Sequence, residues 1–159
     1  MTKHILIVCL GNTCRSPMAT ALLNEIIRRH GQAGSIEVSS AGIWAQEGHP
    51  ATPLAQRVMQ ERGLDISAHR SHLLKPQDVA AADVVVAMEK GIAEAIAIES
   101  PDQAGKVHTL ADLADEAGDV QDPIGGSLDD YRRTADLLQA MLNRAYGRIL
   151  VLLGLASSA

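Results

Sequence analysis

A cysteine and an arginine stand six positions apart near the start of the chain, and their spacing defines the chemistry that the sequence can support. Cys9 follows the apolar, β-branched run 5–8, which predicts a buried strand, and Arg15 precedes residues 18–27, which predict a helix. The segment between them is therefore a loop that leaves a strand and enters a helix N-terminus. Such a loop directs several backbone N–H groups and a partial positive charge at one point, where a tetrahedral anion can bind.

Individual residues of the loop fit anion binding. Gly11 lets the backbone approach a ligand closely, and Asn12 tolerates a left-handed conformation better than most residues. The planar fork of Arg15 can hold two phosphate oxygens, while Ser16 can donate its hydroxyl to the Cys9 sulfur. The positive field at the helix start should lower the pKa of the Cys9 thiol, so we expect a thiolate placed for in-line attack on a phosphoryl group.

A buried cysteine at a strand end and a solvated arginine would explain these two residues separately, but not the whole string. Cys9-x-x-x-x-x-Arg15-Ser16, with Gly11-Asn12 inside it and Pro17 after it, resembles the signature loop of the low-molecular-weight protein tyrosine phosphatases. The resemblance implies a protein phosphatase that forms a cysteinyl-phosphate on Cys9, acts on phosphotyrosine or phosphoarginine, and needs no cofactor. It also implies that phosphate is bound by the other loop residues, which are Leu10, Gly11, Asn12, Thr13, Cys14 and Ser16.

A second constellation, Asp122-Pro123, lies in the glycine-rich segment 118–126. A carboxylic acid on such a loop can protonate the leaving group and then activate water against a phosphocysteine. By itself, an aspartate before a proline predicts only a turn. The family resemblance assigns Asp122 as the general acid, because those phosphatases carry this acid in an Asp-Pro loop before the C-terminal helix. Asp119, which no proline follows, is the rival carboxylate.

Cys14 and His69 have supporting roles by the same resemblance. Cys14 is a second thiol that can form a disulfide with Cys9 under oxidation, and the alternative is a small buried residue that packs the loop. His69 helps to hold Asn12, as scaffolding and not as a catalyst. The histidines of the chain do not fall at metal-ligand spacing, so we predict no metal.

Three residues are expected to line the substrate pocket, namely Thr13, Trp44 and Ile124. Trp44 is the only tryptophan and lies in a polar loop, where it contacts a ligand unless it is a partly buried core aromatic. Thr13 stands where the family more usually has Ile or Val, and Ile124 with two glycines follows Asp122-Pro123 where tyrosines would stack on a phenol. Both departures resemble the bacterial branch that removes phosphate from protein arginine, in which the threonine favours the polar guanidinium.

Composition limits the remaining possibilities. The 159 residues suit one domain, 1–159, and 47% hydrophobic residues without any phenylalanine predict an aliphatic core. The net charge of −5 argues against nucleic acid as a partner, and no apolar run reaches the roughly 18 residues of a membrane span. Two cysteines within one loop make no disulfide framework, and the first residues lack a secretory cleavage site. We therefore expect a cytoplasmic protein that acts on phosphorylated proteins.

Strands and helices are predicted to alternate along the chain. Apolar runs predict strands at 5–8, 35–40, 83–88 and 106–110, and a short extended piece at 66–71. Helical spacing and caps predict helices at 18–27, 54–62, 77–81, 91–98 and 129–153, the last capped by Ser127 or Asp129. This alternation predicts an α/β fold with a four-stranded parallel sheet and helices on both faces. Ligands of such sheets bind at the carboxyl ends of the strands, where Cys9 lies.

Other functional classes fit the sequence less well. An arsenate reductase with the same kind of loop needs two further cysteines, and no cysteine follows Cys14. A non-catalytic phosphate-binding module has no need for a thiol. A redox dithiol protein usually has two residues between its cysteines, whereas four separate Cys9 from Cys14. The sequence therefore favours a phosphatase.

Overall fold

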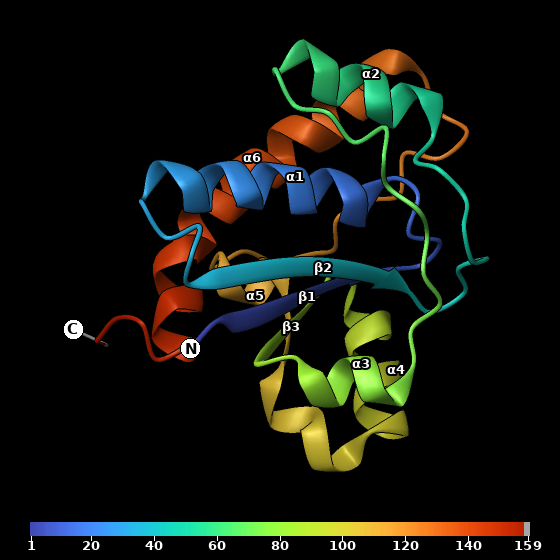
Figure 1. Ribbon diagram of the computed structural model, residues 1–159. Helices are drawn as coiled ribbons and strands as arrows, with labels where there is room; N and C mark the ends of the chain where they lie inside the picture. The colour runs from blue at the N-terminus through green and yellow to red at the C-terminus, as the bar shows by residue number, and fades with distance from the viewer. Residues whose placement is uncertain (158–159) are drawn as a thin grey trace.

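Four parallel strands form the centre of the fold (Figure 1). They are β1 (Lys3–Cys9), β2 (Ile36–Gly42), β3 (Val84–Ala87) and β4 (Val107–Thr109), in the spatial order β2-β1-β3-β4. Every pairing is parallel, so the carboxyl ends of the strands meet at one edge, and β1 brings Cys9 to that edge. The structure, a computed structural model, describes residues 1–157, and the last two residues of the predicted domain lie outside the described residues.

Helices cover both faces of the sheet, as the strand–helix alternation predicts (Figure 1). One face carries α1 (Arg15–Arg29), α2 (Pro53–Glu61) and α6 (Leu128–Leu152), and the other carries α3 (Pro76–Ala81) and α4 (Lys90–Glu99). A 3-10 turn, η1 (Pro101–Lys106), and a one-turn helix, α5 (Leu110–Leu113), flank β4. Within residues 1–157, no helix combines the length and the apolar run that crossing a membrane requires.

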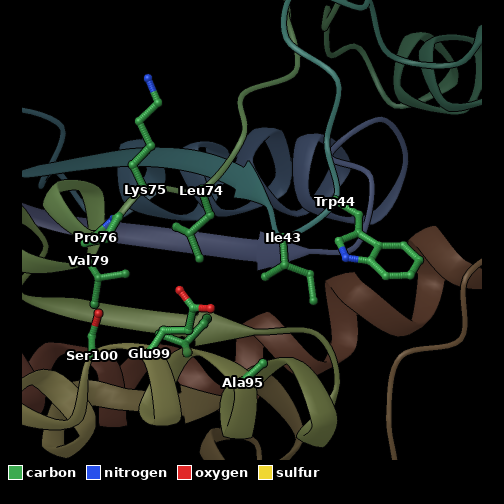
Figure 2. A pocket seen from close by; sticks show the side chains of 10 residues that line it. Ile43, Trp44, Leu74, Lys75, Pro76, Val79, Ala95, Glu99 and Ser100 are labelled. Atoms are coloured by element: carbon green, nitrogen blue, oxygen red, sulfur yellow. The ribbon is translucent and has the colours of Figure 1, made fainter.

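Aliphatic side chains pack against both faces of β1. Ile5 and Ile7 lie in the larger cluster together with Leu138 of α6, and all three are fully buried. Leu6 and Val8 alternate to the opposite face and join the smaller cluster under α3 and α4. Burial on both faces explains why this strand is an unbroken apolar run in the sequence. A pocket opens on the second face between α3, α4 and the loop after β2 (Figure 2).

Two helices begin where capping residues predict. Thr52 caps α2, because its hydroxyl accepts the N–H of Ala55 at 3.3 Å. Ser127, and not Asp129, caps α6. The Ser127 hydroxyl accepts the N–H of Asp130 at 3.2 Å, and the Asp130 carboxylate accepts the N–H of Ser127 at 2.9 Å. This capping box determines where the loop that contains Asp122 ends.

The structure differs from the sequence-based prediction in short segments. α1 begins at Arg15 instead of residue 18, so Arg15 stands inside the first turn. Pro17 still fits there, because first-turn N–H groups have no intrahelical acceptor. The segment 66–71 turns instead of extending, since the Asp65 carboxylate accepts the N–H of Ser67 at 2.8 Å. The elements η1 and α5 are too short to show a helical period in the sequence.

The orientation of α6 predicts how much each of two neighbouring leucines contributes to stability. Leu138 is fully buried, whereas its neighbour Leu137 is 40% exposed. Leu138→Ala should lower the free energy of unfolding by about 2–5 kcal/mol, because a buried leucine loses its transfer energy and leaves a cavity. Leu137→Ala should cost only about 0.5 kcal/mol. Urea denaturation followed by circular dichroism measures both, and equal losses would contradict this orientation of α6.

Candidate active site

The loop after β1 is held against the end of β2. The N–H of Ile43 donates to the Cys9 carbonyl at 3.1 Å, and the N–H of Trp44 donates to the Leu10 carbonyl at 2.9 Å. Gly42 permits this approach, because a Cβ atom there would lie 2.5 Å from the Leu10 carbonyl oxygen. The loop then turns at Asn12, whose φ of 58° is the left-handed value that the sequence suggests for it.

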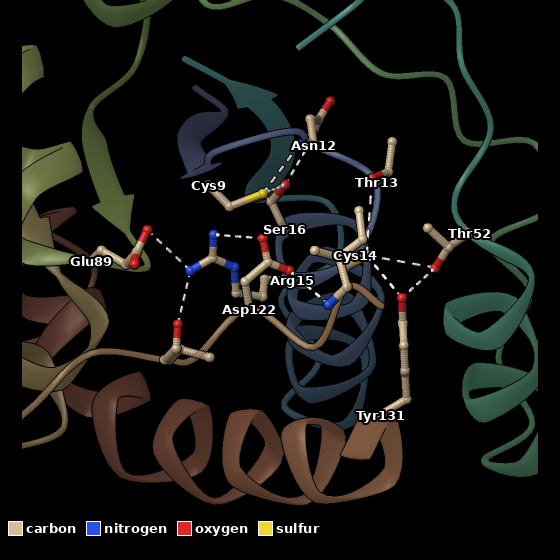
Figure 3. A network of polar contacts seen from close by, with 12 residues as sticks. Cys9, Asn12, Thr13, Cys14, Arg15, Ser16, Thr52, Glu89, Asp122 and Tyr131 are labelled. Carbon is tan, nitrogen blue, oxygen red and sulfur yellow. Dashed lines mark hydrogen bonds and ion pairs between the residues drawn. The ribbon is translucent and has the colours of Figure 1, made fainter. Parts of the chain in front are cut away.

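Cys9, the candidate nucleophile, ends β1 with its sulfur buried between the loop and the start of α1 (Figure 3). The Ser16 hydroxyl oxygen lies 2.9 Å from the sulfur, and the backbone N–H of Asn12 donates to the sulfur at 3.3 Å. The N-terminus of α1 adds a partial positive charge. All three features favour a negative charge on the sulfur.

Burial acts on the Cys9 thiol in the opposite direction. It raises the pKa of the thiol above its ordinary value, and the hydrogen bonds from Ser16, the charge of Arg15 and the N–H of Asn12 lower the pKa without reversing that direction. The structure therefore differs from the sequence-based expectation of a lowered pKa. The sequence argument included the field at the helix start, but the loss of hydration around the sulfur depends on packing.

Asn12 connects the loop to three other segments. Its side-chain amide donates to Ser16 Oγ at 2.6 Å and to Ser40 Oγ at 2.9 Å, and its Oδ1 accepts the N–H of His72 at 2.9 Å. Its backbone carbonyl accepts from His69 Nε2 at 2.7 Å, and burial lowers the pKa of His69, which favours the neutral ring. The structure thus places His69 against Asn12, as expected. Ser40 and His72 were not predicted, because nothing in the sequence near the loop indicates them.

Arg15 is 1% exposed and points toward the carboxyl edge of the sheet. Its Nη1 donates to the Val120 carbonyl at 2.8 Å and lies 3.2 Å from Glu89 Oε2, and its Nη2 lies 3.5 Å from Asp122 Oδ2 (Figure 3). Glu89 is a functional-site residue that sequence reasoning missed. Its position two residues after the buried strand β3 was the available signal, since side chains there reach the same edge of the sheet as Cys9.

The structure distinguishes the two candidate acids. Asp122 faces Arg15, and its other carboxylate oxygen accepts the N–H of Ile124 at 3.1 Å, which orients the side chain within its turn. Asp119 instead accepts the N–H of Lys90 at 2.8 Å, at the start of α4. Of the two candidate acids, the fold therefore brings Asp122 to the Arg15 guanidinium.

Cys14 has its own set of partners, away from those of Cys9. Its sulfur lies 3.4 Å from the Tyr131 hydroxyl and 3.6 Å from Thr52 Oγ1, and both cysteines are free thiols. Burial and the contact with Cys14 raise the pKa of Tyr131 to about 12. This geometry matches the packing role considered for Cys14, while the disulfide with Cys9 stays a prediction for oxidising conditions.

The predicted pocket residues lie in the loop, next to it, or in the turn of Asp122. Trp44 and Ile124 are 80% and 61% exposed, so neither is a core residue. Trp44 follows β2 beside the loop, and Ile124 belongs to the turn of Asp122. Thr13 is partly buried in the loop itself, where its carbonyl accepts the N–H of Thr52 at 3.0 Å. In the part of the chain that the structure describes, no group of three or more His, Cys, Asp or Glu side chains gathers as metal ligands would.

Known proteins resemble this chain in sequence. The sequence profile of the low molecular weight phosphotyrosine protein phosphatases matches residues 4–149. A protein-arginine-phosphatase of Geobacillus stearothermophilus is 40% identical over 145 residues, which cover 91% of this chain and 94% of the relative. The probable low molecular weight protein-tyrosine-phosphatase EpsP of Ralstonia nicotianae is 37% identical over 139 residues, which cover 87% of this chain and 90% of the relative.

A solved structure has the same fold. It is the YwlE arginine phosphatase as a cysteine-to-serine mutant with a phosphorylated active-site serine. It superimposes with a TM-score of 0.86 at 38% sequence identity, and the match covers 93% of this chain and 95% of that chain.

The contact between Ser16 and the Cys9 sulfur predicts how the reactivity of Cys9 depends on pH. This hydrogen bond is the strongest of the effects that lower the pKa of the Cys9 thiol. Ser16→Ala should therefore raise that pKa and move the pH midpoint of Cys9 alkylation by iodoacetamide upward by about one unit, the size of one charge-assisted hydrogen bond. Peptide mass spectrometry measures alkylation at Cys9 separately from Cys14. Ser39→Ala, at an exposed position of β2, is the control, and an equal or lower midpoint in Ser16→Ala would contradict the prediction.

Proposed function

The chain belongs to the low molecular weight phosphotyrosine protein phosphatase family, and from this premise we propose that it hydrolyses phosphoproteins by way of a phosphoryl group carried on Cys9. It is a phosphatase of the type whose relatives act on tyrosine or arginine. The observation that carries the proposal is the convergence of three side chains at one edge of the sheet, where the Arg15 guanidinium lies beside the loop above Cys9 and contacts Asp122.

In the proposed first step, the deprotonated Cys9 sulfur attacks phosphorus, and the bond from phosphorus to the leaving oxygen or nitrogen breaks. Asp122, in its protonated form, gives its proton to the leaving atom. In the second step, water attacks the phosphocysteine, Asp122 accepts a proton from the water, and inorganic phosphate leaves. The sulfur regains its negative charge, which the Ser16 hydroxyl and the Asn12 N–H then stabilise. The phosphorylated serine in the cysteine-to-serine mutant of the YwlE phosphatase supports a covalent route.

Arg15 is proposed to bind the phosphoryl oxygens with its planar fork. The Val120 carbonyl and Glu89 hold one terminal nitrogen, and this restricts the guanidinium to one orientation. The second terminal nitrogen faces Asp122 at 3.5 Å, a distance at which a phosphoryl group can compete for it. Phosphate binding would thereby loosen the contact between Arg15 and the Asp122 carboxyl group and leave that group free to face the leaving atom.

Two features favour phosphoarginine as a substrate, next to phosphotyrosine and simple aryl phosphates. Thr13 provides a hydroxyl at the loop where an aliphatic side chain would suit a phenol ring. Ile124, with the glycines after it, offers no aromatic ring on the side of Asp122. The 40% identity to a protein-arginine-phosphatase supports the same substrate class, whereas the 37% identity to a probable tyrosine phosphatase supports the alternative.

We also infer that the protein works in the cytoplasm. The proposed nucleophile and its neighbour Cys14 are both free thiols, and a catalytic thiol stays reduced in that compartment. Both would be exposed to disulfide formation in an oxidising compartment.

The assignment of the acid predicts a leaving-group effect. Asp122→Ala should reduce turnover of an aryl phosphate with a poor leaving group by about 10²–10⁴-fold, because the departing oxygen no longer receives a proton. Turnover of p-nitrophenyl phosphate should fall less, since nitrophenolate leaves without help. Steady-state kinetics measure both, with Asp119→Ala as the matched control and Cys9→Ser as the inactive one. Unchanged turnover of the poor substrate in Asp122→Ala would remove Asp122 from its proposed role.

The role of Thr13 predicts a change in substrate preference. Thr13→Ile should lower kcat/KM for a phosphoarginine peptide relative to kcat/KM for a phosphotyrosine peptide by about tenfold. The reason is that an apolar side chain replaces the hydroxyl that contacts the guanidinium of the substrate. Thr13→Ser keeps the hydroxyl and should keep the ratio. Parallel assays of the two peptides check this, and an unchanged ratio in Thr13→Ile would refute the assignment.

A further inference from the structure

The pocket on the second face of the sheet is a groove with aliphatic and polar walls (Figure 2). It lies between the loop after β2, the start of α3 and the C-terminal half of α4, and it encloses about 200 Å³. Its walls include Ile43, Leu74, Val79 and Ile96. Walls of this kind can pack against the methylene groups of a long side chain.

Glu99 places a carboxylate inside this groove. Its carboxylate points into the groove, whereas the ammonium end of Lys75 points away from it (Figure 2). None of the ion pairs within residues 1–157 includes Glu99. Glu99 is also the last residue of α4, and a helix C-terminus favours a cation and disfavours an acidic side chain. The carboxylate and the helix end therefore attract a positively charged group together.

The backbone connects the groove to the catalytic loop. Ile43, in the groove wall, donates its N–H to the carbonyl of Cys9. Trp44 also lines the groove, is exposed, and is hydrogen-bonded to the carbonyl of Leu10. The groove therefore adjoins the segment that holds the catalytic loop, and a peptide bound over Cys9 can extend past Trp44 toward it.

We propose that the groove is a subsite for a basic side chain, Lys or Arg, that lies close in sequence to the phosphorylated residue of the substrate protein. The inference rests on the proposed phosphatase function and adds a determinant of substrate choice outside the phosphate-binding loop. The aliphatic stem packs against Ile43, Leu74 and Val79, and the cation reaches the Glu99 carboxylate. An aliphatic side chain would leave Glu99 without a partner, and an acidic side chain would be repelled.

The test uses phosphopeptides that differ in one flanking residue, which is Lys, Glu or the uncharged norleucine, placed at successive positions on either side of the phosphorylated residue. At the best position, kcat/KM for the Lys peptide should exceed that for the norleucine peptide by about fivefold, the size of a partly exposed charge pair. Glu99→Gln should abolish this preference, and Glu99→Lys should convert it into a preference for Glu. Glu94→Gln, the same charge change at an exposed position of α4 outside the groove lining, should retain it.

Hydrolysis of p-nitrophenyl phosphate, which is too small to reach the groove, separates the possible outcomes. If the wild-type protein fails to hydrolyse it, the proposed function itself is wrong. If hydrolysis is normal but the two peptides react equally, or if the Lys preference survives in Glu99→Gln, the subsite alone is overturned. Concentration-dependent dimerisation that Glu99→Lys abolishes, measured by sedimentation velocity, would assign the groove to a second copy of the chain and would also overturn the proposal.

Discussion

The arrangement of the site depends on Asn12, the residue with a left-handed backbone in the middle of the loop. Its side-chain amide is hydrogen-bonded to Ser16, Ser40 and His72, and its backbone carbonyl is hydrogen-bonded to His69. The helix α1, the strand β2 and the segment before α3 therefore all determine where the loop lies. Its own N–H is then free to point at the Cys9 sulfur. Because all of these groups are hydrogen-bonded, contacts within the protein hold the loop in its curved form.

The site keeps a guanidinium and a thiol out of water, and each needs compensation. Arg15 is compensated by two carboxylates and a carbonyl, which explains how an almost fully buried arginine can be tolerated. The groups around Cys9 offset the loss of water around its sulfur only in part. Burial therefore raises the pKa of the thiol despite the hydrogen bonds and the charge around it. In the proposed mechanism, a phosphoryl dianion would be held by the N–H groups at the helix start and by the Arg15 guanidinium.

Substrate recognition, as proposed, involves two surfaces with different physical character. The loop and its rim, with Thr13, Trp44 and Ile124, surround the phosphorylated group itself. The groove with Glu99 lies on the other side of Trp44 and combines apolar walls with one negative charge. Both surfaces meet at the carboxyl end of β2, because the residues that follow this strand bond to the loop with their backbone and line the groove with their side chains.

The sequence by itself determined the features that depend on neighbouring residues. The strand that ends at Cys9, the helix that follows, the left-handed Asn12 and the cap of α2 at Thr52 are local, since propensity, caps and turns act over a few residues. The parallel α/β fold also followed from alternating patterns that a single pass along the chain contains.

Only the tertiary structure decided which distant groups meet at the loop. Glu89 and Ser40 lie far from Arg15 and Asn12 in the sequence, and strand order alone brings them together. Asp119 and Asp122 are near neighbours with the same side chain, yet the turn before α6 aims only Asp122 at Arg15, while Asp119 binds the start of α4. The direction of the Cys9 pKa likewise depends on burial, which is a property of the packed chain and not of the residues next to the thiol.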